Sequence, residues 1–428
     1  MFQKKDFPFQ QKTHEAVIYD SGDFKASLEK LLELMNYKKM LEIQGEFNRD
    51  ENNLKIMGIG FSTWLEIAGF GPNGSLESFG HLASWESAHI RIQPDGSVIL
   101  NVGTSPHGQG HVTVFSQIAA DYLGMDINKI LVRHGDTETV QQGMGTFGSR
   151  AVPTGGEAVK NVCVQVNEKA KLIASKSDVV VMVLGEEGHQ SGEGRSRTNI
   201  GLPGLQLELL KEIHKVNKNI VLVVMSGRPL DLTWEDKHIP SILQAWQLGS
   251  KSGDAIANVL FGDYNPSGKL TMSFPRNVGQ VPVYYNFKNT GRPSTSIEQV
   301  TNSGYADVEN SPLYSFGYGL SYTNFSYSNL SIDNDNMNKT SSIKASIELS
   351  NTGSRKGKEV VQLYIRDVVG SIARPMKELK GFKLIELNPG ESTTVEFEID
   401  NSLLEFYTYN KKWESEPGKF QLFIGGNS

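Results

Sequence analysis

A carboxylate between two glycines is the side chain of this sequence best placed for acid–base chemistry. Glu193 lies in the segment SGEGRSR, and its neighbours are two glycines and two arginines, Gly192, Gly194, Arg195 and Arg197. Glycines give a loop reach and mobility, and an arginine can either fix such a loop or contact a polar ligand. The segment therefore indicates either a general acid or base on a mobile loop, or a solvated glutamate at the surface.

A second glycine-rich turn lies in the segment GTSPHGQGH, where Gly108, Gln109 and Gly110 precede a predicted helix. Glycines before a helix N-terminus expose backbone N–H groups and the positive end of the helix dipole, which suits an anionic pyrophosphate. The other interpretation is a strand-to-helix turn that binds no ligand. Both remain open on the residues alone.

The sequence predicts no metal site. His107, His111 and His134 fit no zinc-binding spacing. Cys163 is the only cysteine, so this chain can form no intrachain disulfide and no thiolate zinc or iron–sulfur cluster. A lone cysteine within a helical pattern is expected to be a small buried side chain.

Composition indicates a globular protein of two to four domains. Among the 428 residues, 38% are hydrophobic and 21% charged, and the net charge is −6. No basic surplus is present to attract nucleic acid or anionic lipid, so we expect neither nucleic acid nor membrane partners. The first residues contain lysines but lack the apolar run of a secretory signal, which makes cytoplasmic residence the expectation.

Two kinds of secondary structure must position the glycine-rich turns. The N-terminal region has an α+β pattern: a helix capped by Asp23, a β-hairpin around Asp95-Gly96, and a helix from about His111 to Leu123 that Gly124 ends. From Asp178, the apolar segments DVVVMVLG, NIVLVVM and ILQAW alternate with helices, which predicts a parallel sheet covered on both faces. One of these helices is expected to start at Pro203, and DLTWED is expected to be a turn.

The Glu193 loop leaves the carboxyl end of the first of these parallel strands, where ligands of open α/β sheets usually bind. A Pro/Gly-rich stretch over residues 265–322 is expected to be an extended linker or a wrapped loop. After Phe325, about seven short alternating strands predict a β-sandwich.

Residues 175–428 resemble the C-terminal part of family 3 glycoside hydrolases, of the bacterial periplasmic β-glucosidase type. The segments that carry the resemblance are SDVVVMVLGE, SGEGRSRTNIGLPG, NIVLVVMSGRPLDL, FGDYNPSGKLTMSFPRNVGQVPVYYN, LYSFGYGLSYTNF, ARPMKELKGF and PGKFQLFIGG. The resemblance implies that Glu193 is the acid/base in retaining hydrolysis of terminal β-glucosides, without a cofactor. It also implies that Arg195 and Arg197 hold the loop or contact hydroxyls of a β-glucoside or oligosaccharide.

In that family the nucleophilic aspartate lies on an N-terminal TIM barrel, which residues 1–428 do not contain. We therefore expect the chain by itself to be inactive, since one carboxylic acid cannot form the glycosyl-enzyme intermediate. Hydrolases of this type are often periplasmic or secreted, in contrast to the cytoplasmic expectation from the N-terminus.

Residues 1–174 resemble a fragment of the molybdopterin-binding large subunit of the xanthine dehydrogenase, aldehyde oxidase and carbon monoxide dehydrogenase family. The matching segments are FPFQ with YDSGDF, MGIGFSTWLEIAGFGP, GTSPHGQGHVTVFSQIAADYLG and GDTETVQQGMGTFGSR. This resemblance implies that Gln109 faces a molybdenum centre, with Gly108 and Gly110 beside the pterin. Molybdopterin would be a cofactor only under this second interpretation.

The sequence thus predicts a multidomain α+β and α/β chain in three parts. These are an α+β molybdenum-hydroxylase fragment over 1–174, a parallel α/β domain truncated at its start with its linker over 175–325, and a fibronectin type III-like β-sandwich over 326–428. The two resemblances meet within one predicted helix, at residues 156–176. Three functions follow: a β-glucosidase-type hydrolase by descent, a molybdopterin-binding fragment, or a non-catalytic fusion product.

Overall fold

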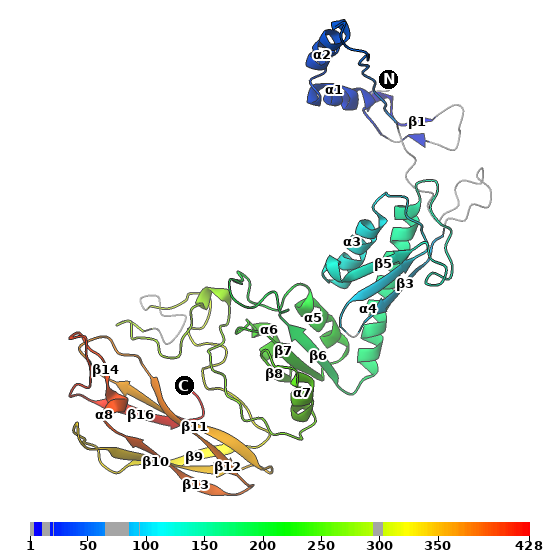
Figure 1. Ribbon diagram of the computed structural model, residues 1–428. Helices are drawn as coiled ribbons and strands as arrows, with labels where there is room; N and C mark the ends of the chain where they lie inside the picture. The colour runs from blue at the N-terminus through cyan, green and yellow to red at the C-terminus, as the bar shows by residue number, and fades with distance from the viewer. Residues whose placement is uncertain (1–3, 11–17, 20, 65–84, 94, 294–302) are drawn as a thin grey trace. The chain divides into compact units, whose positions relative to one another are not determined.

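The computed structural model describes residues 4–10, 18–19, 21–64, 85–93, 95–293 and 303–428. It divides into two compact units, Met1–Ala170 and Lys171–Ser428 (Figure 1). Parts of the quoted segments YDSGDF and MGIGFSTWLEIAGFGP, and of the stretch over residues 265–322, lie outside the described residues. Among the helices of the described ranges, none has the length and apolarity that crossing a membrane requires.

The first unit begins with a helical pair. Its elements are a 3-10 turn η1 (Lys4–Asp6), the antiparallel strands β1 (Phe9–Gln10) and β2 (Ile18–Tyr19), and the helices α1 (Phe24–Leu34) and α2 (Tyr37–Arg49). Asp23 caps α1, as predicted, because its Oδ1 accepts a hydrogen bond from the Ala26 N–H at 3.0 Å. No residue of α1 or α2 is buried, so this pair has no core of its own.

A three-stranded sheet forms the packed part of the first unit. Its strands are β3 (Ala88–Ile92), β4 (Val98–Val102) and β5 (Ile130–His134), with β3 antiparallel and β5 parallel to β4. The other elements are α3 (His111–Leu123), the 3-10 turn η3 (Ile127–Lys129), the π-turn η4 (Ala151–Gly156) and α4 (Glu157–Lys176), whose last residues belong to the second unit. The predicted hairpin, the bounds of α3 and the continuous helix over 156–176 are thus confirmed.

The core of this sheet contains the chain's one cysteine. Leu100, Phe115 and Cys163 are fully buried in a single apolar cluster, which confirms the predicted burial of the thiol. Burial raises the pKa of Cys163 to about 11, so the reactive thiolate is scarce at neutral pH.

The second unit opens with a parallel sheet. Its strands are β6 (Val180–Gly185), β7 (Ile220–Met225) and β8 (Ser241–Gln244), and its helices are α5 (Gln206–Val216), α6 (Thr233–His238) and α7 (Ser252–Leu260). Buried residues of α5 pack with β7 in one apolar cluster, against which Trp234 of α6 also packs. The three predicted strands are confirmed, but the helix expected at Pro203 begins at Gln206.

Two expectations about this sheet are wrong. Val181 and Val183 of β6 are 49% and 55% exposed, so the outer face is not covered at this strand. DLTWED was expected to be a turn, but Thr233 opens α6, with the Thr233 N–H donating to Asp231 Oδ1 at 3.0 Å. Tertiary packing around Trp234 stabilises a helix that is too short to show periodicity in the sequence.

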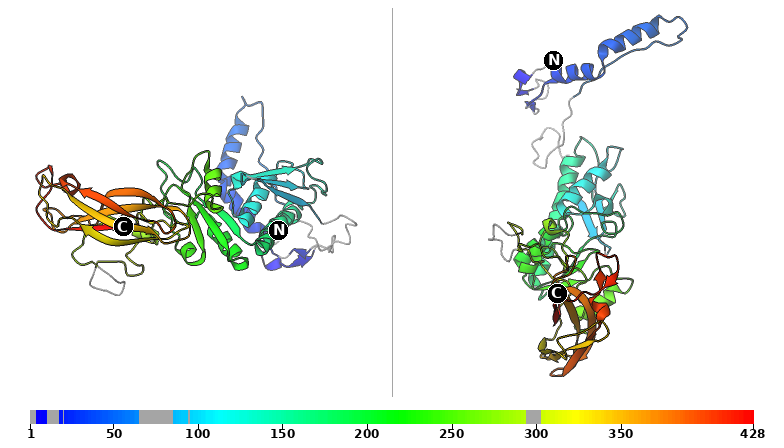
Figure 2. Two further views of the ribbon diagram at one scale, coloured as in Figure 1. Left: turned by 90° about the horizontal axis from the view of Figure 1, so that it is seen from below. Right: turned by 90° about the vertical axis from the view of Figure 1, so that its left-hand side faces the viewer.

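The C-terminal strands form the predicted β-sandwich (Figures 1 and 2). One sheet has the order β13-β10-β9 and the other β12-β11-β16. The elements are β9 (Phe325–Ile332), β10 (Ile343–Asn351), β11 (Gly357–Asp367), β12 (Glu378–Leu387), β13 (Ser392–Ile399), α8 (Asn401–Leu404), β14 (Phe406–Tyr407), β15 (Trp413–Glu414) and β16 (Phe420–Gly425). Alternate residues of β10 are buried in a core shared with β11 and β13, as in two antiparallel sheets packed face to face.

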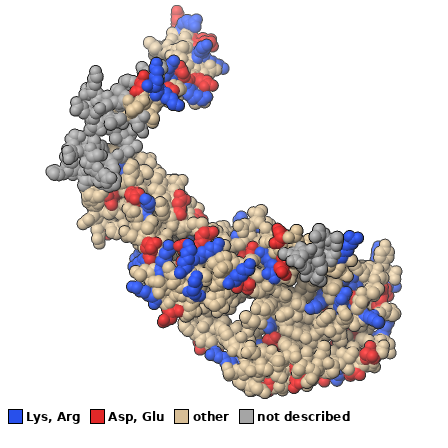
Figure 3. Space-filling view, turned by 180° about the vertical axis from the view of Figure 1, so that it is seen from behind, with Lys and Arg blue, Asp and Glu red and all other residues tan. Residues whose placement is uncertain are grey.

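The described parts of the stretch between sheet and sandwich, up to residue 293 and from residue 303, form a wrapped loop. It includes the 3-10 turn η5 (Val278–Gln280), and its backbone pairs with itself where the Phe274 N–H donates to the Tyr314 carbonyl at 2.8 Å. Tyr285 stacks on Phe316 at 4.2 Å between ring centroids. On the face drawn in Figure 3, Lys and Arg lie among Asp and Glu rather than in a separate patch.

Helix α6 buries a carboxyl group, and this predicts a pH-dependent stability. Glu235 is 2% exposed, and burial raises its pKa to about 7 from 4.5. Because the folded state binds this proton more tightly, stability is fully present below pH 4.5 and falls as pH rises to about 7. The shift corresponds to a loss of about 3 kcal/mol.

Glu235→Gln should remove that loss. We expect the stability difference between variant and parent chain, measured by urea unfolding, to move in favour of the variant by about 3 kcal/mol from pH 4.5 to pH 8. Glu208→Gln, at an exposed position of α5, is the control. An identical difference for both variants at both pH values would contradict the prediction.

Candidate active site

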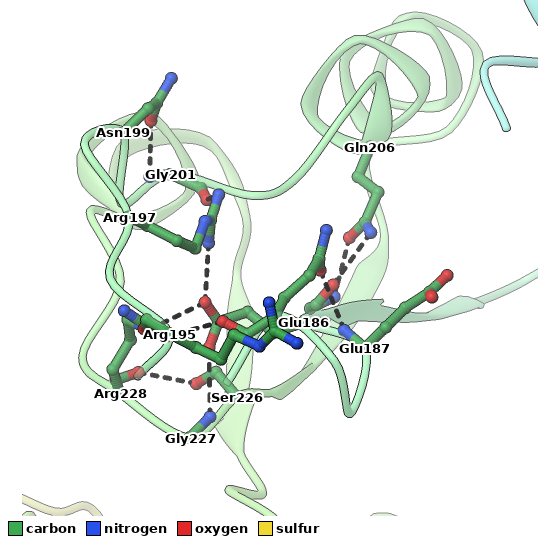
Figure 4. Close-up of polar contacts among 12 residues, drawn as sticks. Glu186, Glu187, Arg195, Arg197, Asn199, Gly201, Gln206, Ser226, Gly227 and Arg228 are labelled. Atoms are coloured by element: carbon green, nitrogen blue, oxygen red, sulfur yellow. Dashed lines mark hydrogen bonds and ion pairs between the residues drawn. The ribbon is translucent and has the colours of Figure 1, made fainter. Parts of the chain in front are cut away.

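Polar residues gather where the three parallel strands end (Figure 4). Glu186 directly follows β6, the residues from Ser226 to Arg228 directly follow β7, and Gln244 ends β8. Carboxyl ends of parallel strands meet at one edge of a sheet, so these side chains are brought together although they lie far apart in the sequence. Gln244 Nε2 donates to Ser226 Oγ at 3.0 Å, which links the ends of β7 and β8.

Glu186 is the buried centre of this group. Its side chain is 0% exposed, and its Oε1 lies 2.8 Å from Arg197 Nη1 and 2.9 Å from Arg228 Nε. The Gly227 N–H donates to Oε2 at 3.3 Å. A carboxylate removed from water requires such partners, and two guanidinium groups together with a backbone amide supply them.

Both arginines also donate hydrogen bonds to backbone carbonyls of the glycine-rich loop. Arg228 Nη2 donates to the carbonyls of Gln190 and Arg195, at 2.7 and 2.9 Å. Arg197 Nη2 donates to the Gly201 carbonyl at 2.9 Å. Hydrogen bonds from arginine side chains therefore fix the loop backbone on both sides of Glu193.

Glu193 itself is exposed at the tip of this loop. Gly192 and Gly194 have φ values of +140° and +69°, in the region that favours glycine. The two glycines thus give a defined turn conformation, where the sequence indicated mainly reach and mobility. Within the described residues, no side chain or backbone group forms a hydrogen bond or ion pair with the Glu193 carboxylate.

Close approaches of the backbone fix the base of the loop. At Gly185, with φ of +142°, a Cβ would lie 1.8 Å from the Met225 carbonyl oxygen. At Gly227, a Cβ would lie 1.9 Å from Ser191 Oγ. Gln206 makes two hydrogen bonds to the Gly185 backbone, at 2.7 and 2.9 Å. The strand ends and the loop therefore pack without room for larger residues.

The structure distinguishes the two predicted arginines. Arg197 fixes the loop, which is one of the two roles that the sequence left open. Arg195 contributes its carbonyl to Arg228, and its side chain is exposed. Contact of either arginine with a substrate remains a prediction. Sequence reasoning assigned no role to Glu186 or Arg228, although a charged residue directly after an apolar strand (Glu186) or three residues after one (Arg228) was a usable signal.

The second glycine-rich turn is an open one. Gly108 and Gly110 have φ of +95° and +81°, and among the described residues no atom lies within 4 Å of a Cβ built at either. The oxygen of the Gln109 side chain accepts a hydrogen bond from the His107 N–H within the same turn. The Gln109 side chain is thus hydrogen-bonded within its own loop. Neither glycine is required by close contact with another part of the described chain. The predicted contact of these three residues with a pterin stays a prediction.

Arg150, in the nearby GTFGSR segment, has a structural role. It is 1% exposed and pairs with the fully buried Glu86 at 3.1 Å. Its Nη1 also donates to the Gly145 carbonyl at 2.7 Å, and its Nη2 donates to the Trp85 carbonyl. Its guanidinium is therefore directed into the first unit.

Two of the described histidines of the first unit, His111 and His134, lie close together in its interior. His111 is buried with neither ring nitrogen hydrogen-bonded, and its ring centroid lies 6.1 Å from that of His134. Burial lowers the pKa of both rings, which are therefore neutral at pH 7. No cluster of three or more His, Cys, Asp or Glu able to hold a metal ion occurs in the described parts of the chain.

Comparison with known sequences matches most of the chain to one family. The sequence model of the glycosyl hydrolase family 3 C-terminal domain matches residues 101–322, and that of the fibronectin type III-like domain matches residues 359–428. The chain is 48% identical over 262 residues to the periplasmic beta-glucosidase of Salmonella typhimurium, covering 61% of this chain and 34% of that enzyme. It is 43% identical over 259 residues to a beta-xylosidase of Formosa agariphila, covering 60% and 34%.

Solved structures give the same result. A beta-glucosidase from Listeria innocua in complex with glucose is 38% identical, with a TM-score of 0.58, over 61% of this chain and 37% of that one. A mutant of that enzyme in complex with laminaribiose is also 38% identical, with a TM-score of 0.58, over 61% and 36%. The chain therefore spans about a third of the length of the relatives it matches.

The comparisons give no support to a molybdopterin-binding part. The first family match begins at residue 101 and so includes the Gln109 turn, which the sequence analysis assigned to a molybdenum hydroxylase fragment. The predicted boundary between residues 174 and 175 stays a prediction.

Proposed function

Because this chain belongs to glycosyl hydrolase family 3, we propose that it contributes the general acid/base, Glu193, to the retaining hydrolysis of terminal β-glucosides. The observation that carries the proposal is the geometry of the 185–202 loop. An exposed carboxylate without a partner among the described residues lies at its tip, and two arginines hold its flanks at the carboxyl edge of a parallel sheet.

The reaction needs a second carboxylate. Retention requires one carboxyl group to protonate the leaving oxygen and another, about 5–5.5 Å away, to attack the anomeric carbon. Glu186 cannot take that role, because it is fully buried and both of its oxygens are bound by Arg197, Arg228 or Gly227. Under this proposal the nucleophile is the aspartate that the resembled family carries on its barrel domain, outside residues 1–428.

A β-glucoside is the proposed substrate class. The relatives that share this region include beta-glucosidases, and the similar Listeria innocua structures hold glucose or laminaribiose. A beta-xylosidase is also among the relatives, so the test must include both sugars.

A graft tests the proposal. The matching third of the Salmonella typhimurium enzyme is replaced by residues 171–428 of this chain, and release of nitrophenol from aryl β-glucoside and β-xyloside is measured. We expect turnover of the β-glucoside by the graft and none by the 428-residue chain, because one acid cannot form the covalent intermediate. A folded but inactive graft would favour the non-catalytic interpretation, and turnover by the chain alone would show that it holds its own nucleophile.

A further inference from the structure

We propose that Glu186 is a positioning residue that holds the turn carrying Glu193 in place through Arg197 and Arg228. The catalytic meaning of this role rests on the proposed function, but the anchoring itself does not. Figure 4 shows the arrangement, with the Glu186 carboxylate between the two guanidinium groups.

The contacts enclose the turn from both sides. Arg228 binds the carbonyls of Gln190 and Arg195, which bracket the segment that contains Glu193. The Gly227 backbone lies against Ser191, the first residue of that segment, so closely that no Cβ fits. The turn therefore packs against the residues that follow β7, and its position depends on the orientation of the Arg228 side chain.

Glu186 sets that orientation. The carboxylate is fully buried, whereas the side chains of Arg197 and Arg228 are 17% and 22% exposed. Both cations converge on the same oxygen of Glu186. If that oxygen lost its charge, two like charges would face each other with little water between them, and one arginine would have to move away. Movement of either arginine would break its hydrogen bonds to the loop backbone and free one side of the turn.

The position of the turn matters because proton transfer requires close contact. A general acid must lie within hydrogen-bond reach of the leaving oxygen, and a displacement of about 1 Å can cost about 100-fold in rate. Glu186 touches no reacting atom in this scheme, because Arg197, Arg228 and Gly227 occupy its oxygens.

A spin label at position 193 measures the anchoring directly. Glu193→Cys introduces the one reactive thiol, since Cys163 is fully buried. A nitroxide is attached in the otherwise unchanged 428-residue chain and in a second chain that also carries Glu186→Gln. We expect broad, ordered spectra in the first and narrow, mobile spectra in the second. In the unlabelled Glu186→Gln chain, amide exchange of residues 187–202 should rise about tenfold, while exchange of β7 stays unchanged.

Matched variants separate anchoring from general loss of structure. Glu187→Gln removes a partly exposed carboxylate of the same loop, and Glu359→Gln removes the buried partner of Lys269 elsewhere in the unit. Neither should mobilise the label. Glu186→Asp keeps the charge on a shorter side chain and should restore most of the order.

The outcomes are distinct. Unchanged label mobility in Glu186→Gln would overturn the proposal, as would equal mobility in Glu359→Gln or faster exchange spread over β7. An anchored turn in a chain whose graft is inactive would uphold the positioning role and reject the hydrolytic one. If the turn were already mobile in the chain that keeps Glu186, and the graft were active, the hydrolytic role would be upheld and the positioning role rejected.

Discussion

Replacing Glu193 by glutamine in the active graft is expected to lower kcat/KM for an alkyl β-glucoside by about 10²–10⁴-fold. An amide cannot donate the proton that an alkoxide leaving group needs. The loss should be much smaller for a dinitrophenyl β-glucoside, whose leaving group departs without protonation. Steady-state rates with the two substrates measure the difference.

Glu187→Gln is the matched control, because it removes a carboxylate from the same loop. It should keep the kcat/KM of the graft for both substrates. An equal loss for both leaving groups in Glu193→Gln would mean that this carboxylate is not a general acid. Full activity of Glu193→Gln on the alkyl glucoside would exclude it from catalysis.

Arg150→Met is expected to lower the stability of the first unit by about 3–5 kcal/mol. The substitution leaves the buried Glu86 carboxylate without its cation, although the N–H groups of Ser87 and Met144 still donate to it, and it removes hydrogen bonds to the carbonyls of Gly145 and Trp85. Amide exchange within α3, or chemical unfolding, measures the loss.

A double variant checks the cause of that loss. Adding Glu86→Leu removes the unpaired charge, so the double variant should regain much of the stability. Lys160→Met, which breaks an exposed pair with Glu157, should leave the unit unchanged. If the double variant were as unstable as Arg150→Met, the loss would come from packing rather than from the buried charge.

Much of the fold could be predicted from local patterns. The unbroken apolar runs identified β6 and β7, the alternating residues of β10 and its neighbours identified the sandwich, and Asp23 and Gly124 marked helix ends that the structure confirms. The position of the Glu193 loop after β6 followed from the same patterns. These features depend on neighbours in the sequence, since periodicity and turn chemistry act over a few residues.

What the sequence did not determine depends on contacts between distant residues. Helix α6 was missed because it is stabilised by packing of Trp234 against the apolar cluster of the sheet. The exposed face of β6 was missed because the burial of a strand depends on which helices lie over it. The Gln109 turn matched a cofactor-binding motif, yet its side chain closes on its own loop.

The sequence by itself determined that Glu193 lies on a glycine-rich loop at the carboxyl edge of a parallel sheet. Only the tertiary structure decided that Glu186, Arg197 and Arg228 hold this loop. The reason is physical: Glu186 directly follows β6, Arg228 lies three residues after β7, and the sheet register brings the ends of these two strands side by side. A carboxylate buried there must find opposite charges nearby, and no local pattern in the sequence states which arginines those are.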